Sequence, residues 1–408
     1  MKTLQIITII FMIITTTYSV YHVMIGVMGF KRPREYKKAE PKTRFAVLIA
    51  ARNEEKVIGN LIDTLTSQNY PKELYRIFVI PNHCTDATRG IALEHGAEII
   101  DCTVTVCKKG DVLQFAFNEL EKNGDFDAYC VFDADNLADG IFLAEVNNAF
   151  CSGENIVQGC RNSKNPEDGM TAGSHSIYLG AMNKFCFQAR TACKISSIVV
   201  GTGFAFKKSV LAKLGGFNTD SVTEDLEFSA QCVMAGEKIV FLPGAKFYDE
   251  QPLGFRQSCI QRQRWSYGTI QIFKMYAKRL YRCYIKEKSC SVFDQFMLNI
   301  APFVQVLGLL TAVIGISFLQ HSIYTWAWLG VNILFSLGLS YFGILLMGMF
   351  VTLILNKRSL WKLRKGILGF WIFMMSWGFI SFGCFFKKEL RWKEVKHVKS
   401  VTLNQIAK

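Results

Sequence analysis

Two aspartates flank a single alanine in Asp133-Ala134-Asp135, directly after a strand-like apolar run at residues 128–132. Carboxylate oxygens placed in this way can converge on one hard divalent cation, which prefers oxygen ligands. The turn therefore predicts a site for magnesium or manganese. Acidic residues are common in turns, so the meaning of this pair depends on the other polar groups of the chain.

Basic and amide groups elsewhere in the chain suit the phosphates that such a cation would bridge. Lys109 precedes Gly110 at the predicted start of a helix, whose backbone N–H groups and dipole favour an anion. Gln261 and Arg264 add further hydrogen-bond donors. Together these groups would neutralise the charge that develops when a nucleotide diphosphate leaves a sugar. The alternative for Lys109 is a solvent-facing lysine in a loop.

The segment Thr223-Glu224-Asp225 supplies a candidate base. A buried aspartate can remove the proton from an attacking hydroxyl, and we assign that role to Asp225. Glu224 is either a helix cap or a contact to the acceptor. The acidic pair also fits the first turn of a helix that continues to Met234, where negative charge is favoured, and the two interpretations are compatible.

Gln261, Arg264 and Trp265 are spaced at i, i+3 and i+4, so a helix would present an amide, a guanidinium and an indole on one face. An indole can stack on the apolar face of a sugar, which makes Trp265 a candidate floor for an acceptor sugar. The basic and aromatic stretch at residues 255–283 also predicts interfacial helices lying on lipid. An ordinary solvated helix is the alternative for this stretch.

Strand-like runs alternate with helical patterns from residue 45 onward. This βαβ alternation predicts a mostly parallel sheet that is covered by helices on both faces. Ligands collect at the carboxyl ends of such strands, where we place Arg52, Asn82 and Asp86 as donor-binding residues beside Asp133. The expected strands are residues 45–50, 77–81, 98–101 and 128–132, and the expected helices are residues 54–67, 85–95 and 111–121.

Residues 1–30 predict a retained membrane anchor, because an apolar stretch of spanning length ends in a basic cluster and no small-residue cleavage site follows it. The basic flank places the next domain in the cytoplasm. Thirteen cysteines without any C-x-x-C pair then predict reduced thiols. The net charge of +14 gathers beside apolar segments, which favours membrane lipids as partners and no nucleic acid.

Changes in composition divide the rest of the chain into an α/β domain at residues 31–250, interfacial helices at 251–290, membrane helices at 291–388 and a basic tail at 389–408. Apolar runs at residues 293–319, 323–355 and 367–386 are each long enough to cross a bilayer. Three single crossings would leave the basic tail outside, against the positive-inside tendency. Either the longest run splits into two spans, or one run is re-entrant.

With these groups in place, the chain resembles the membrane-bound family 2 glycosyltransferases, which include cellulose, chitin, hyaluronan and poly-N-acetylglucosamine synthases. Their shared pattern is D, D-x-D, [T/G]-[E/D]-D and Q-x-x-R-W, and 35 residues separate Asp225 from Gln261 here. The resemblance implies a Rossmann-like GT-A domain with an α-helical transmembrane region. It also implies an inverting transfer from a UDP-sugar, with Asp133 and Asp135 at the diphosphate and its metal and Asp225 as the base.

The same resemblance implies that Gln261 and Arg264 contact the diphosphate and that Trp265 borders the acceptor. Gly203 would lie in a glycine-containing segment beneath the acceptor, where the missing side chain permits close approach. The family usually has an aspartate after the second strand, where this chain has Asn82. Asn82 can still pair with uracil; alternatively Asp86 serves, or caps the next helix. The gating signature of the cellulose synthases is not evident, so cellulose is not the expected product.

The leading hypothesis is an integral membrane enzyme whose cytoplasmic domain elongates a β-linked polysaccharide and whose own spans conduct the product. Transfer of a single sugar to a lipid acceptor is the alternative. A membrane scaffold without activity is a third possibility, which the intact Asp133, Asp135, Asp225 and Arg264 oppose. The donor sugar depends on the shape of the pocket rather than on these motifs.

Overall fold

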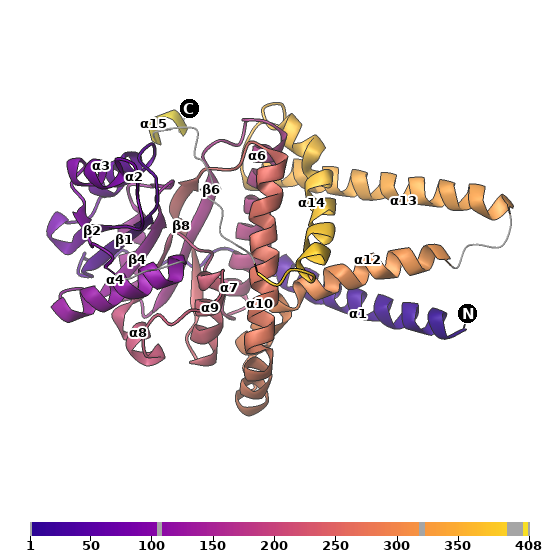
Figure 1. Ribbon diagram of the computed structural model, residues 1–408, viewed down its shortest axis with the longest axis horizontal. Coiled ribbons are helices and arrows are strands. Elements are labelled where there is room, and N and C mark those ends of the chain that lie inside the picture. The colour runs from indigo at the N-terminus through magenta and orange to yellow at the C-terminus, as the bar shows by residue number, and fades with distance from the viewer. Residues whose placement is uncertain (1, 104–107, 318–322, 390–402, 407–408) are drawn as a thin grey trace.

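The computed structural model describes residues 2–103, 108–317, 323–389 and 403–406. Apolar helices extend from one side of an α/β domain (Figure 1). Within the described residues, eight strands form one sheet in the order β3-β2-β1-β4-β7-β6-β8-β5. The strands are β1 (Phe45–Ala51), β2 (Tyr75–Pro81), β3 (Glu98–Ile99), β4 (Ala128–Asp133), β5 (Leu137–Ala138), β6 (Ile156–Ser163), β7 (Phe204–Lys207) and β8 (Ile239–Asp249).

The sheet is mixed and mostly parallel, as the alternating pattern predicts. Strands β3, β2, β1 and β4 are parallel to one another, and β6 is parallel to β8. Strand β7 runs antiparallel between β4 and β6, and the short β5 runs antiparallel to β8. Antiparallel strands of this kind are common in otherwise parallel α/β sheets.

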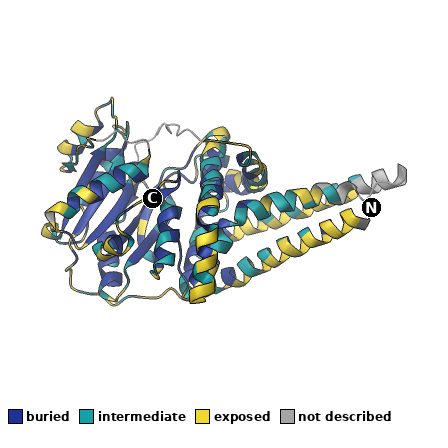
Figure 2. Ribbon diagram, turned by 60° about the horizontal axis from the view of Figure 1, so that its bottom comes forward, coloured by how far each residue is buried: buried dark blue, intermediate teal, exposed yellow. Residues whose placement is uncertain are grey.

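Successive residues of β1 are buried on opposite faces of the sheet. Val47 and Ile49 pack with residues of α2 (Ile58–Thr66) and α5 (Phe142–Cys151), whereas Ala46 and Leu48 pack with residues of α4 (Lys109–Asn123) and α9 (Glu224–Met234). Figure 2 shows the buried strands between these helices. A strand covered on both faces explains the continuous apolar run in the sequence.

Two helices begin later than the sequence pattern predicts, because the preceding polar residues shape loops. Helix α2 begins at Ile58 rather than at residue 54: Asn53 has a left-handed φ of 57°, and the Glu54 amide donates to Thr88 Oγ1 at 2.8 Å. Helix α3 (Thr88–Glu94) begins at Thr88 rather than at residue 85, where the Asp86 carboxylate accepts a hydrogen bond from the Thr88 amide at 3.0 Å.

Among the described residues, the segments Thr3–Phe30, Gly330–Leu355 and Arg364–Cys384 are long and apolar enough to cross a membrane. They belong to α1 (Lys2–Val27), α13 (Ile323–Phe350) and α14 (Arg364–Cys384). Helices α11 (Cys290–Asn299) and α12 (Ala301–Ser317) meet at a 50° bend. The apolar run predicted at residues 293–319 is therefore broken near Ile300.

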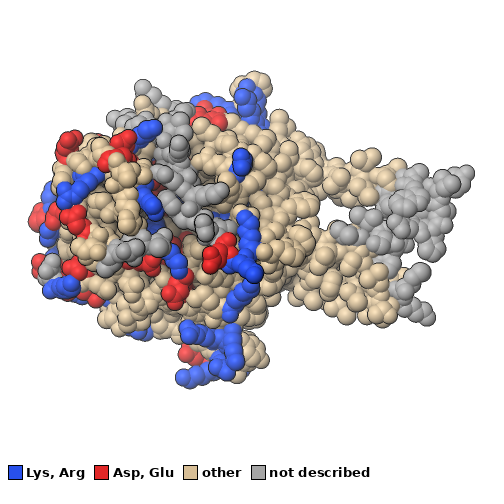
Figure 3. All heavy atoms as spheres, viewed as in Figure 1, with Lys and Arg blue, Asp and Glu red and all other residues tan. Residues whose placement is uncertain are grey.

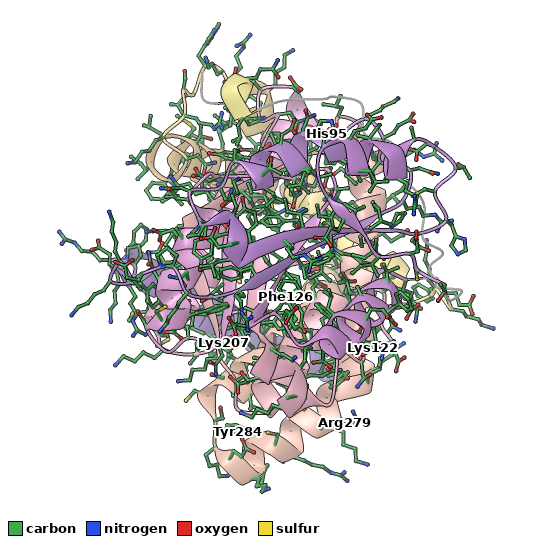
Figure 4. The ribbon with its side chains drawn as sticks, turned by 90° about the vertical axis from the view of Figure 1, so that its left-hand side faces the viewer. His95, Lys122, Phe126, Lys207, Arg279 and Tyr284 are labelled. Carbon is green, nitrogen blue, oxygen red and sulfur yellow. The ribbon has the colours of Figure 1, made fainter. Side chains whose placement is uncertain are left out.

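A single helix of 33 residues, α10 (Phe255–Glu287), occupies the stretch for which the sequence predicts several interfacial helices. Figure 1 shows it between the α/β domain and the apolar helices. Its far end, which carries Arg279 and Tyr284, projects beyond the domain (Figure 4). Helix α6 (Met170–Ala181) lies on the domain side of this junction.

One buried ion pair joins three elements at the base of the apolar helices. Arg190 of α7 (Ala189–Ala192) donates to Asp294 of α11, with Nε 2.7 Å from Oδ2. The Tyr21 hydroxyl of α1 donates to the other oxygen of Asp294 at 2.9 Å. The side chains of Arg190 and Asp294 are 2% and 1% exposed, so neither charge has water as a substitute partner.

We expect Asp294→Ala to lower the free energy of unfolding by about 3–5 kcal/mol, because it leaves a buried guanidinium without its counter-charge. Thermal melting in detergent micelles measures this. Lys213→Ala is the control, since Lys213 is half exposed in its pair with Glu237 and such pairs contribute less than about 1 kcal/mol. Equal losses in the two variants would contradict the assignment, and replacing both Arg190 and Asp294 by Leu should recover much of the stability.

Candidate active site

Polar residues follow the carboxyl ends of three neighbouring strands, β2, β1 and β4. Ala50 of β1 pairs with Ile80 of β2 on one side and with Asp133 of β4 on the other, so these strands end at the same level. Arg52 and Asn82 therefore lie at the edge that carries Asp133. The structure thus brings together the strand ends that the sequence places in one crevice, and the contacts of Arg52 and Asn82 with a donor stay predictions.

Asp86 holds the loop between β2 and α3. One carboxylate oxygen accepts from the Thr88 amide and hydroxyl, and the other accepts from the Glu55 amide at 3.1 Å. Burial opposes ionisation here, but these hydrogen bonds outweigh it and lower the pKa of Asp86 below its ordinary value. The helix-cap alternative matches these contacts, whereas a contact with the donor stays a prediction.

Lys109 lies among the acidic groups of the crevice. Its ammonium pairs with the Asp133 carboxylate, donates to the Gly201 carbonyl at 2.6 Å and lies 3.8 Å from Glu224. Burial opposes the charged form, but Asp133 and Glu224 outweigh it and raise the pKa of Lys109. This lysine, which opens α4 as predicted, is therefore a member of the site rather than a solvent-facing loop residue.

Asp225 lies in the same crevice. A Cβ atom added at Gly201 would come within 3.3 Å of Asp225 Oδ2, and Gly201 has a φ of +75°, which favours glycine. Burial raises the pKa of Asp225, against the hydrogen bond from the Leu226 amide and the charges of Lys109 and Arg264. A raised pKa makes the carboxylate a stronger proton acceptor, which suits a general base.

Glu224 is a second carboxyl of this group whose pKa is raised. Burial raises its pKa to about 7, with Lys109 acting in the opposite direction and Asp225 adding to the increase. Its side chain is 12% exposed and faces Lys109 rather than capping α9. The structure therefore places Glu224 near Lys109, Asp225 and Asp133, and its contact with the acceptor stays a prediction.

A chain of buried hydrogen bonds supports the turn of Asp133 and Asp135. Asn136, which directly follows Asp135, is completely buried. Its amide nitrogen donates to Asp135 at 3.2 Å and to Asp249 at 3.0 Å, and its oxygen accepts from the Thr202 hydroxyl. That hydroxyl in turn accepts from the Asp133 amide at 2.9 Å. Asn136 is thus a positioning residue for the aspartate pair.

Asp249, at the end of β8, fixes the other end of this chain. Its carboxylate accepts from Arg161 Nε at 3.0 Å and from Gln251 Nε2 at 2.8 Å. Burial opposes ionisation, yet Arg161 outweighs it and holds the pKa of Asp249 below its ordinary value. No spacing in the sequence marks Asp249 or Arg161, because they reach the site only through the pairing of β6 with β8.

The residues present fit a divalent cation that a phosphate ligand completes. Within the described ranges, no three His, Cys, Asp or Glu side chains converge closely enough to hold a metal by themselves. The partly exposed Asp133 and the buried Asp135 offer carboxylate oxygens at the carboxyl end of β4. Magnesium is usually bound by one or two carboxylates together with substrate phosphates and water, so this donor set is adequate.

Close packing brings α10 onto the Thr223-Glu224-Asp225 segment. A Cβ atom at Gly268 would lie 2.3 Å from the Thr223 side chain, so only glycine permits this approach. The Val222 amide also donates to Gln271 Oε1 at 3.1 Å. Arg264 comes close enough for its charge to lower the pKa of Asp225, and Gln261 Oε1 is buried without a hydrogen-bond partner.

Trp265 lies in a cluster of aromatic rings from α6, α10 and α14. Its ring is 6.3 Å from that of Tyr178 in a stacked arrangement, 6.0 Å from that of Trp377 and 6.2 Å from that of His175. Trp377 also donates to the Ser266 hydroxyl at 3.0 Å. Trp265 is therefore part of a larger group of rings, here called the aromatic wall, and its contact with an acceptor stays a prediction. The spacing of residues in the sequence does not connect Trp265 with Tyr178 or Trp377.

Arg262 has a different environment from Arg264, two residues away. It is completely buried, donates to the Phe373 carbonyl at 2.6 Å and to Ser376 at 2.9 Å, and lies 4.2 Å above the Phe373 ring. The sequence counts it among the basic groups at the lipid surface. It instead anchors α14 to α10, because the carbonyl, hydroxyl and ring replace its water.

Gly203, predicted beneath the acceptor, packs inside the domain. A Cβ atom there would lie 2.2 Å from the Phe247 ring, and its φ is +61°. The residue therefore permits close packing between β7 and β8, and a contact with the acceptor stays a prediction.

Comparison with known proteins gives a consistent picture. The family described as "Glycosyltransferase like family 2" matches residues 41–268. The chain is 25% identical to "Probable glycosyltransferase YdaM" of Bacillus subtilis over 71% of each chain. It is 27% identical to "Beta-monoglucosyldiacylglycerol synthase" of Nostoc over 65% of its own length and 58% of that enzyme. It is 24% identical to "Poly-beta-1,6-N-acetyl-D-glucosamine synthase" of Staphylococcus epidermidis over 75% of its own length and 72% of that enzyme.

Among solved structures, the fold is similar to that of the mannosyltransferase PcManGT from Pyrobaculum calidifontis, which was solved with GDP-Man and Mn2+. The TM-score is 0.63 at 16% identity, and the match covers 95% of this chain and all of that one. At this identity the likeness establishes the fold, a GT-A-like domain with a mostly parallel sheet.

The pKa of Glu224 predicts a pH dependence of stability. Because the folded-state pKa is raised from 4.5 to about 7, the folded protein binds a proton more tightly than the unfolded chain. The stability from this group is present below about pH 4.5 and is lost as the pH rises towards 7. Between pH 5.5 and 7.5 in buffer without divalent cations, we expect a smaller decrease in melting temperature for Glu224→Gln than for the unaltered protein. Parallel curves would contradict the assignment.

Removal of the Asn136 side chain should weaken the aspartate turn. Asn136→Ala removes the acceptor of the Thr202 hydroxyl and one hydrogen bond each from Asp135 and Asp249, so we expect about 1–3 kcal/mol lower stability and about tenfold weaker binding of Mn2+. Thermal melting and the electron paramagnetic resonance of free Mn2+ measure these quantities. Asn69→Ala, at an exposed asparagine, is the control. An unchanged Mn2+ affinity in Asn136→Ala would contradict the positioning role.

Proposed function

This chain belongs to glycosyltransferase family 2, and on that premise we propose that it transfers a sugar from a UDP-sugar to a growing β-linked polysaccharide at the membrane surface. The proposed reaction inverts the anomeric carbon and uses Mg2+ or Mn2+. The catalytic domain is proposed to lie in the cytoplasm, attached through the apolar helices.

The observation that carries this proposal is the position of α10. One helix contacts Thr223 through Gly268, brings the charge of Arg264 to Asp225, and places Trp265 in the aromatic wall. The proposed phosphate-binding guanidinium of Arg264 and the proposed sugar-stacking ring of Trp265 thus belong to one helix, which packs against the segment that carries the proposed base. This element also contacts α14, so an acceptor at the aromatic wall would lie beside the membrane.

The donor would bind across the carboxyl edge of β1, β2 and β4. Asn82, with Arg52 or Asp86 beside it, would contact the uracil end, and Lys109, Gln261 and Arg264 would contact the diphosphate. Asp133 and Asp135 would hold the cation, which when bound offsets the charge of the diphosphate. The buried, unpaired Gln261 Oε1 supports a polar ligand at this position, because such groups are rarely left without a partner.

The acceptor hydroxyl would then be activated by Asp225. The oxygen of the acceptor hydroxyl forms a bond to the anomeric carbon of the donor sugar. The bond from that carbon to the β-phosphate oxygen breaks, and UDP leaves with the electron pair. The hydroxyl proton goes to the Asp225 carboxylate. The charges of Arg264 and Lys109 favour the ionised form of this carboxylate, against its burial, and in this proposal both also stabilise the departing phosphate.

A lipid acceptor is the second candidate. It is favoured by the similarity to the beta-monoglucosyldiacylglycerol synthases of Nostoc, Trichormus and Synechocystis, and the aromatic wall suits an acceptor that arrives from the bilayer. The polysaccharide candidate is favoured by the intact Q-x-x-R-W motif and by the similarity to the poly-N-acetylglucosamine synthase, which extends over 75% of the chain.

The test is UDP release by detergent-purified protein with a panel of UDP-sugars and Mg2+ or Mn2+, followed by sizing of the product. A long polymer that a glycoside hydrolase degrades supports the proposal. A single glycolipid extractable into organic solvent overturns the polymer assignment and supports the second candidate. Absence of release with every donor overturns both.

We expect Asp225→Asn to lower the rate of UDP release by about 10²–10⁴-fold, because the amide cannot accept the proton. Binding of UDP, measured by calorimetry, should change little, since the donor contacts other residues. Asp220→Asn, at an exposed aspartate outside the crevice, is the control. A rate for Asp225→Asn equal to that of the control would remove Asp225 from the mechanism.

A further inference from the structure

A buried glutamate of α9 holds the loop that precedes the proposed base. Glu227 lies two residues after Asp225 and is 1% exposed. Its Oε2 atom accepts hydrogen bonds from the backbone amides of Asp220 at 2.9 Å and Ser221 at 2.7 Å. The reaction proposed above gives Glu227 no part in binding the donor or in moving a proton. Its contacts instead fix the course of the chain directly before Thr223.

The other carboxyl oxygen of Glu227 contacts α10. The Tyr276 hydroxyl donates to Glu227 Oε1 at 2.8 Å and accepts from Gln231 Nε2 at 2.9 Å. Gln231 Nε2 also donates to the Asn218 carbonyl at 2.7 Å. The side chains of Glu227, Gln231 and Tyr276 are here called the Tyr276 clamp. Through this clamp, both ends of the loop at residues 218–221 depend on one hydroxyl of α10.

Two further contacts join α10 to the same segment. The Val222 amide donates to Gln271 Oε1 at 3.1 Å, and the missing side chain of Gly268 admits Thr223. From Gly268 to Tyr276, these contacts extend over about 12 Å of helix, since a helix rises about 1.5 Å per residue. The segment that ends in the proposed base is therefore fixed to α10 at three separate points.

An apolar core between α9, α10 and α11 surrounds the Tyr276 clamp. Ile272 and Leu280 of α10 are completely buried in this core together with Ala230 and Val233 of α9. Tyr276 itself is 4% exposed. Water does not readily replace a partner that is lost from such a place, so removal of one clamp group should leave the others unsatisfied.

The charged side of α10 is separate from this core. Figure 3 shows Lys and Arg side chains gathered where the α/β domain meets the apolar extension, and Figure 1 shows α10 along this boundary. Substitutions within the clamp therefore leave the surface charge of α10 unchanged. The exposed basic residues in this half of the helix are Lys274, Lys278, Arg279, Arg282 and Lys286.

We infer that Glu227 and Tyr276 are positioning residues, which hold the Asp225 segment against α10 and so set the distance between the base and Arg264. This inference rests on the proposed function, in which Asp225 accepts the proton. Residues two positions apart on a helix point in different directions, so Glu227 acts through the loop and not by touching the substrate. A displacement of the base by about 1 Å can lower a rate about 100-fold.

Tyr276→Phe tests this role, because it removes one hydroxyl and keeps the ring. We expect the rate of UDP release at saturating UDP-sugar to fall about 10–100-fold, with the KM for the donor changed less than about twofold. Tyr70→Phe is the matched control: Tyr70 is 6% exposed, and its hydroxyl donates to the Thr43 carbonyl at 2.9 Å, away from the crevice. Equal rates in the two variants, or a loss confined to KM, would overturn the inference.

Substitutions at the half-buried Gln271 test the same segment with less risk to folding. Gln271→Ala removes the acceptor of the Val222 amide, whereas Gln271→Glu keeps an oxygen at that place. We expect Gln271→Ala to lower the rate of UDP release about tenfold and Gln271→Glu to recover most of it. An equal loss in both variants, or no loss in either, would overturn the inference even if Tyr276→Phe failed to fold.

Hydrogen exchange separates this inference from the proposed function. In the detergent-purified full chain, we expect the amides of Asp220 and Ser221 to exchange about tenfold faster in Tyr276→Phe than in the unaltered protein or in Tyr70→Phe. Unchanged exchange would show that the clamp does not hold the loop. Faster exchange with an unchanged rate of UDP release would overturn the positioning role alone. No release by the unaltered protein would overturn the proposed function, and the positioning role with it.

Discussion

The ammonium of Lys109 makes the acidic crevice possible. Glu224 and Asp225 are buried close to each other and to the partly exposed Asp133, and these like charges raise the free energy of the folded chain. The ammonium of Lys109 pairs with Asp133 and lies near Glu224. Its position depends on the start of α4, where a Cβ atom at Gly110 would meet Thr219 and Glu224, and on the carbonyl of Gly201. The sheet edge, α4 and α9 therefore have to meet at one point.

Much of this arrangement could be predicted from the sequence, because it depends on local pattern. Apolar alternation gave the strands and the covering helices, and the rule that ligands collect at strand ends gave Arg52, Asn82 and Asp133. The starts of α2 and α3 could not be predicted, since they depend on side chains of one loop that hydrogen bond to the backbone of another. The similarity to the family supports the assignment of Asp225 as the base. Helical periodicity alone does not distinguish this role from that of a residue at the start of a helix.

The unpredicted parts of the site all depend on contacts between distant segments. Asn136 and Asp249 are 113 residues apart, and Arg262 reaches Phe373 across 111 residues. The spacing of the residues from Gln261 to Trp265 does not show that Arg262 and Arg264 have different surroundings. Two residues that are two positions apart on a helix nevertheless point in different directions. One arginine therefore faces the crevice and the other faces α14, and only the packed structure distinguishes them.

The aromatic wall consists of side chains from three segments, and only one of these segments also carries residues of the proposed catalytic site. Trp265 belongs to the motif beside Asp225, whereas Tyr178 comes from α6 and Trp377 from the C-terminal α14. A lineage can therefore alter the outer part of the wall by substitutions in its last apolar helix while the base and the diphosphate contacts persist unchanged. Divergence in what is glycosylated can accumulate separately from divergence in how the glycosyl group is transferred, which suits a family whose named members make both polymers and glycolipids.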